Sequence, residues 1–113
     1  MRSLRAFSLD RMDEHARYLD PVAALGVTEV RYLAAPTRDI EELVYTVPIG
    51  TPKERVVEVV RRAREACAPL PCSVNEDGTG VCLWEPGLTA KLARTGRTLA
   101  EHWNVPPDLV AGL

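Results

Sequence analysis

The fold is decided by residues 43–74, whose sequence is LVYTVPIGTPKERVVEVVRRAREACAPLPCSV. Its first seven residues favour a β-strand, and we expect Pro48 to end that strand because proline cannot donate to a β-ladder. Thr51, Pro52 and Glu54 carry the start signals of a helix, namely a capping threonine, a proline at the first helical position and a capping-box glutamate. The stretch therefore predicts a strand followed by a helix.

The predicted helix is capped by Thr51, begins at Pro52, extends to about Ala68 and is amphipathic. Arginines occupy its polar face, and Pro69 and Pro71 end it. The residues expected on its buried face are Val56, Val57, Val59, Val60, Ala63 and Cys67.

The residues before this stretch predict a strand, a helix and a second strand. Residues 3–9 alternate with period 2, as in a strand. The helix that follows is expected in two pieces, or kinked, at Pro21, with Gly26 as its C-cap. Residues 27–34 and 43–49 are expected to form an antiparallel hairpin.

Residues 72–84 predict a second, tight hairpin. Asp77-Gly78 is typical of a two-residue turn, which pairs Val74 with Val81 and Cys72 with Leu83. This register gives the hairpin one wholly apolar face and puts Cys72 and Cys82 on opposite faces.

The tail, residues 88–113, is expected to be helical. Gly96 interrupts it, and Thr98 with Glu101 forms a second capping box. Asn104 can adopt the left-handed conformation of a helix end, and a last short helix is expected to start at Pro106-Pro107-Asp108.

These elements define an α+β fold with a small antiparallel sheet and helices on one face. The first six elements follow the βαββαβ order and so resemble the ferredoxin-like unit in element order, with a C-terminal helical extension added. A chain of 113 residues is expected to form one domain, residues 1–113, with a core at about 3–84 and the helical tail at about 88–113.

Composition is that of a soluble globular protein, with 46% hydrophobic and 27% charged residues. The net charge of −2 argues against general affinity for nucleic acid or anionic lipid. No apolar run is long enough for a membrane span, and the first residues lack the apolar core of a signal peptide, so we expect a cytoplasmic location.

Three cysteines are too few and too unevenly spaced for a disulfide scaffold or a zinc site. We expect reduced thiols that pack in the core (Cys67 and Cys72) and one exposed thiol (Cys82), with no metal and no cofactor. Cys82 has no neighbouring cation in the sequence to activate it as a nucleophile.

Candidate functional residues are few. His15 and Tyr45 are weak catalytic candidates, and His102 is expected to be a solvated helix residue. If the tyrosines of the first hairpin point to an uncovered sheet face, they line a ligand site; if they point inward, they belong to the core. The residues of that expected ligand site are Glu29, Arg31, Tyr32 and Tyr45.

The tail also matches the apolar and turn spacing of a helix-turn-helix. The matching residues are Leu99, Ala100, Trp103, Asn104, Val105, Val110 and Leu113. The second helix would carry Asp108 and no residue suited to contact bases or phosphates, which makes nucleic acid an unfavoured partner.

The sequence therefore predicts a small cytoplasmic accessory, regulatory or ligand-binding protein without catalysis of its own. Apolar residues on both sides of the hairpin strands favour a homodimer, because a sheet covered on one face needs a partner or a small-molecule ligand on the other. The alternatives are a cofactor-free enzyme of the isomerase or cyclase type with a cleft on the open sheet face, and a DNA-binding regulator that uses the tail.

Overall fold

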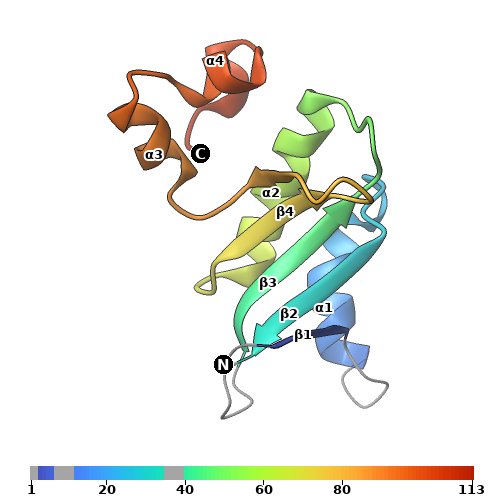
Figure 1. Ribbon diagram of the computed structural model, residues 1–113. Helices are drawn as coiled ribbons and strands as arrows, with labels where there is room; N and C mark the ends of the chain where they lie inside the picture. Colours follow the sequence, from blue (N-terminus) through green and yellow to red (C-terminus); the bar gives the residue numbers. More distant parts are fainter. Residues whose placement is uncertain (1–2, 7–11, 35–39) are drawn as a thin grey trace.

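The computed structural model describes residues 3–6, 12–34 and 40–113, with side chains from residue 16 to 31 and from 42 to 113. The fold is α+β, and its elements follow the predicted order of strands and helices (Figure 1). In the described part of the chain, no helix is both long enough and apolar enough to cross a membrane.

The sheet is mixed, in the strand order β1-β2-β3-β4-β5. β1 (Ser3–Ala6), β2 (Glu29–Ala34) and β3 (Ile40–Val47) are antiparallel to one another in turn. β3 and β4 (Cys72–Glu76) are parallel, and β4 and β5 (Cys82–Trp84) are antiparallel. A purely antiparallel sheet is therefore wrong, because the helix between β3 and β4 carries the chain back to the end at which β3 began.

The ferredoxin-like arrangement is not confirmed. Strands that follow each other in the sequence are also neighbours in the sheet, so no strand is inserted between two earlier ones. The agreement is limited to the order of elements along the chain.

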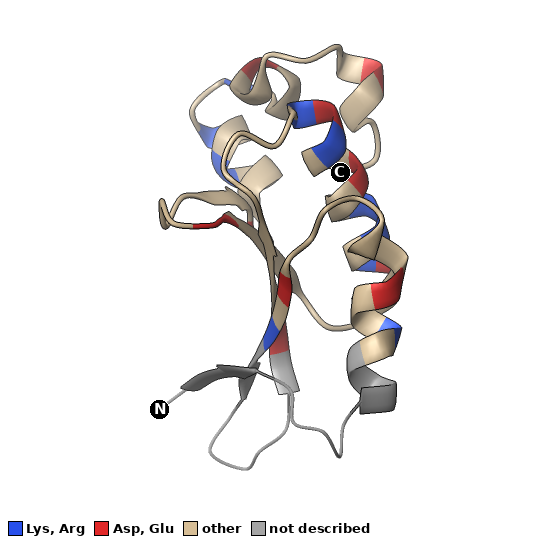
Figure 2. Ribbon diagram, turned by 90° about the vertical axis from the view of Figure 1, so that its right-hand side faces the viewer, with Lys and Arg blue, Asp and Glu red and all other residues tan. Residues whose placement is uncertain are grey.

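The crossover helix α2 (Lys53–Cys67) covers one face of the sheet as predicted. All six residues expected on its apolar face are buried. α1 (Met12–Ala23) lies beside α2 on the same side of the sheet (Figure 2). The core is the layer between these two helices and the strands.

Two local predictions for the helices are wrong. The Thr51 hydroxyl does not cap α2 but donates to the Pro48 carbonyl at 2.6 Å, and Pro52 occupies the N-cap position. The helix begins one residue later than predicted, so the capping box with Glu54 cannot close. In α1 the structure excludes only one of the two alternatives, because the helix passes through Pro21 in one piece; Gly26 follows it with a φ of 91°.

The register of the second hairpin also differs from the prediction. Val74 pairs with Trp84, not with Val81. The physical reason is that the Asp77 amide donates to the Val47 carbonyl at 2.8 Å, so this residue still follows β3 and does not enter a two-residue turn. The turn is longer, and Val81 lies outside the strand and half exposed.

The tail folds into α3 (Leu88–Arg94), α4 (Leu99–Trp103) and a short 3₁₀ helix, η2 (Pro107–Val110). The capping box of Thr98 and Glu101 is confirmed, and its hydrogen bonds to Thr98 lower the pKa of the Glu101 carboxyl. Asn104 adopts the predicted left-handed conformation, with a φ of 56°.

The tail lies at the end of the sheet next to β5 and the end of α2, not over the open face (Figures 1 and 2). Its buried residues join the core cluster, and the Arg61 guanidinium donates to the Leu109 carbonyl at 2.5 Å. The face of the sheet opposite α1 and α2 is therefore left uncovered by the tail.

Neighbouring residues of β3 offer a direct test of this layering. Leu43 is buried beneath the helices, whereas Val44 lies on the open face. We expect Leu43→Ala to lower the free energy of unfolding by about 2–5 kcal/mol, and Val44→Ala by less than about 1 kcal/mol. Chemical denaturation measures both, and equal losses would contradict the assignment of the two faces.

Candidate functional site

Where the structure describes its side chains, the open face of the sheet is mainly polar. The half-buried residues that alternate outward on β2, β3 and β4 are Glu29, Arg31, Glu42, Val44, Thr46, Ser73 and Asn75, and Val44 is the apolar one among them. This described part of the face therefore offers little apolar surface for the pairing of two copies.

Of the expected ligand residues, Glu29 and Arg31 lie together on this open face. The Arg31 Nε atom is 2.6 Å from a Glu29 carboxylate oxygen, and both side chains are more than a third exposed. Tyr32 takes the register position opposite Leu43, and its side chain lies outside the described residues. The same holds for the His15 side chain on α1.

Tyr45 lies on the other side of the sheet from Glu29 and Arg31. It is completely buried, its hydroxyl donates to the Tyr18 carbonyl at 3.2 Å, and the hydroxyl oxygen is 3.2 Å from the Cys67 sulfur. Burial, and next the hydrogen bond with Cys67, raise the pKa of Tyr45 far above its ordinary value. Tyr45 is thus a core residue in its neutral form.

The three cysteines are free thiols, distributed as predicted. Cys67 and Cys72 are buried, whereas Cys82 is exposed and its sulfur donates to the Trp84 carbonyl at 3.2 Å. Partial burial, and then the nearby Glu85 carboxylate, raise the pKa of Cys82, which weakens it as a nucleophile. Among the described residues, no group of three or more potential metal ligands is found.

A cavity of about 380 Å³ lies where the end of α2, the start of β4 and the end of β5 meet the tail. Two segments form most of its wall: the α2–β4 connection, and the residues from the end of β5 into α3. The lining residues are Arg64, Ala68, Pro69, Leu70, Pro71, Cys72, Trp84, Pro86, Gly87, Thr89 and Leu113. Most of its lining residues have apolar side chains, and polar atoms also contribute to its exposed wall, a combination found in small-molecule sites.

Among the described residues that line this cavity, Arg64 is the only one with a charged side chain. Its guanidinium carbon is 5.7 Å from the centroid of the Trp84 ring, so a cation lies over an aromatic face. Trp84 is buried and packs against Trp103, with ring centroids 6.4 Å apart. Arg64 also donates a long hydrogen bond of 3.5 Å to the Gly112 carbonyl.

Arg64 also reaches a neighbouring cavity. That cavity, of about 410 Å³, shares Arg64, Ala68 and Leu113 with the first and adds Arg61 and Glu65. The Arg64 guanidinium therefore lies at the boundary between the two cavities, with the Trp84 ring on one side. This arrangement can hold an anion whose body is flat and apolar.

Neither Arg64 nor Trp84 was predicted from the sequence as a site residue. Arg64 is one of several arginines on the polar side of α2, and Trp84 ends a strand 20 positions later. The available signal was weak: a tryptophan directly before Glu85-Pro86-Gly87, which turns the chain towards α3.

Comparisons with known proteins add no further assignment. No family model, no curated protein and no solved structure matches this chain.

The buried state of Tyr45 predicts a specific alkaline effect. Its pKa is raised by folding, so the stabilisation is complete below the unfolded-state pKa of about 10 and is lost as pH rises above it. We expect Tyr45→Phe to make the free energy of unfolding less steep above pH 10, by up to about 1.4 kcal/mol per pH unit. Urea denaturation at a series of pH values measures this slope, and parallel curves for the two proteins would refute the prediction.

Proposed function

We propose that this chain is a non-catalytic ligand-binding or regulatory protein whose cavity takes a small organic anion with a flat, apolar body. The observation that carries the proposal is the position of the Arg64 guanidinium, over the Trp84 ring and at the mouth of a cavity with no acidic lining residue among those described.

The size and chemistry of the cavity support this ligand class. A volume of about 380 Å³ falls within the range of sites for small molecules. A guanidinium binds carboxylate or phosphate oxygens with two parallel hydrogen bonds. These hydrogen bonds are stronger in partly apolar surroundings than in water. The indole of Trp84 and the ring of Pro69 or Pro86 offer flat surfaces for the body of the ligand.

Two probes of the same shape test the proposal: naphthalene-2-carboxylate and the uncharged naphthalene-2-carboxamide. We expect the carboxylate to bind more tightly, because only it can form charge-assisted hydrogen bonds with Arg64. Arg64→Gln is expected to weaken carboxylate binding by about 10- to 100-fold and to leave carboxamide binding unchanged. Isothermal titration calorimetry measures both affinities.

Arg55→Gln is the matched control, since Arg55 is an exposed arginine of the same helix that is not among the lining residues. It should leave both affinities unchanged. Equal affinity for the two probes, or an equal loss in both variants, would refute the role of Arg64.

Self-association and a cytoplasmic location remain predictions. A homodimer over the open face would have a polar interface that includes the Glu29–Arg31 pair, and its formation would weaken as salt is added. An isomerase- or cyclase-type activity on that face has less support, because Tyr45 does not share the face with Glu29 and Arg31.

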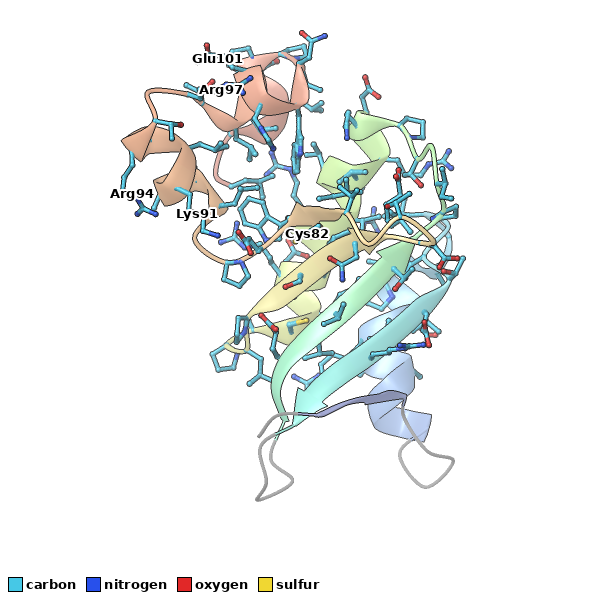
Figure 3. The ribbon with its side chains drawn as sticks, viewed as in Figure 1. Cys82, Lys91, Arg94, Arg97 and Glu101 are labelled. Atoms are coloured by element: carbon cyan, nitrogen blue, oxygen red, sulfur yellow. The ribbon has the colours of Figure 1, made fainter. Side chains whose placement is uncertain are left out.

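DNA binding by the tail is the second candidate, favoured by the capped start of α4 and the left-handed turn at Asn104. The distribution of charged side chains on the tail does not favour contact with DNA phosphates. Lys91 pairs with Glu85, Arg94 is the last residue of α3 and Arg97 follows it (Figure 3). The only charged residue of η2 is Asp108.

We therefore expect no mobility shift of random duplex DNA at low salt. Contacts between basic side chains and the DNA phosphates would produce a mobility shift that disappears as salt is added. If such a shift occurs and both Arg94→Gln and Arg97→Gln weaken it, the tail is a DNA-binding element and the proposal of a purely ligand-binding protein fails.

A further inference from the structure

Three buried polar side chains meet where α2 ends and β4 begins. Cys67 is the last residue of α2 and Cys72 the first of β4, with 1% and 2% of their surfaces exposed. The Tyr45 hydroxyl oxygen lies 3.2 Å from the Cys67 sulfur, and Cys72 pairs in register with Leu43, two residues before Tyr45 on the same buried face of the sheet. The ligand-binding role proposed above uses neither thiol as a binding group.

The two thiols shift each other's pKa in opposite directions. Interaction with Cys72 lowers the pKa of Cys67, against the effect of burial. Interaction with Cys67, together with burial, raises the pKa of Cys72. Cys67 is therefore the thiol of the pair that loses its proton more readily, and the thiolate is the form that begins thiol oxidation.

The cavity provides access to this pair. Cys72 is among its lining residues, although little of its surface is open. A small oxidant that enters the cavity therefore meets Cys72, one residue of the pair, in the cavity wall. Cys82 is separate from the pair: it is exposed on β5 and bonded to the Trp84 carbonyl (Figure 3).

We propose that Cys67 and Cys72 are a redox-active dithiol, which hydrogen peroxide converts to an intramolecular disulfide. In the first step, one thiolate sulfur attacks the peroxide, an S–O bond forms, the O–O bond breaks, and hydroxide leaves and takes up a proton. In the second step, the other sulfur attacks the sulfenic acid, the S–S bond forms and the S–O bond breaks. The thiol proton leaves with the oxygen, so two thiols and one peroxide give one disulfide and two water molecules.

The disulfide would change the wall of the cavity. It closes a ring from Cys67 to Cys72, and all four residues between them line the cavity. It also removes the Cys67 thiol from its hydrogen bond with the Tyr45 hydroxyl. The redox state of the two thiols would thus change the conformation of residues 68–71, which the proposed ligand would contact.

Thiol counting in the folded Cys82→Ser variant tests the inference, because Cys82 is the only other cysteine. After treatment with hydrogen peroxide and removal of the excess, the protein is denatured and alkylated. We expect both remaining thiols to be lost, the intact mass to fall by about 2 Da, and a reductant to restore both thiols. Peptide mapping should show Cys67 linked to Cys72.

Two outcomes overturn the inference: both thiols remain alkylatable, or the product carries added oxygen without a disulfide. Cys72→Ser is the matched control and should yield no intramolecular link between these positions. If this variant does not fold, the peptide map of the Cys82→Ser protein decides alone. A disulfide only between separate molecules would equally refute the intramolecular pair.

Discussion

The burial of one face of α2 against β3 and β4 is the interaction on which the rest of the structure depends. Four valines of this helix are completely or almost completely buried, and each contributes about 1.5–3 kcal/mol relative to exposure. On the outer face, the Arg62–Glu58 ion pair is about half exposed and is worth less than about 1 kcal/mol. Apolar burial therefore determines which side of α2 faces the sheet, and with it the parallel pairing of β3 and β4.

The candidate site follows from this crossover. Because four residues connect α2 to β4, the end of the helix and the start of the strand are held close together, and so are Cys67 and Cys72. The connecting segment becomes one wall of the cavity. The tail completes the opposite wall, since Trp84 packs against Trp103 and fixes where the last helices lie.

The sequence predicted features that depend on residues close together in the chain. The apolar face of α2, the Thr98–Glu101 box and the turn at Asn104 all follow from local spacing. The hairpin register did not follow from local spacing, because the Asp77 amide bonds to β3, which is far away in the sequence. The cavity could not be predicted for the same reason: Arg64 and Trp84 come from different elements that meet only after the crossover and tail are packed.

The open sheet face and the cavity beside Arg64 differ in whether their charged side chains already have partners within the chain. On the open sheet face, Arg31 pairs with Glu29, and the Glu42 carboxylate accepts a hydrogen bond from Ser73 at 3.4 Å. These groups have partners within the chain, so this described part of the face is stable in contact with water.

Arg64 is in a different situation. Among the described residues it forms no ion pair, its hydrogen bond to the Gly112 carbonyl is long, and its guanidinium lies over the Trp84 ring. A cation in such surroundings gains more from an incoming anion than one already paired and exposed, because the anion replaces weak contacts by charge-assisted bonds. The electrostatics therefore favour the cavity over the sheet face as the place where this protein meets a charged ligand.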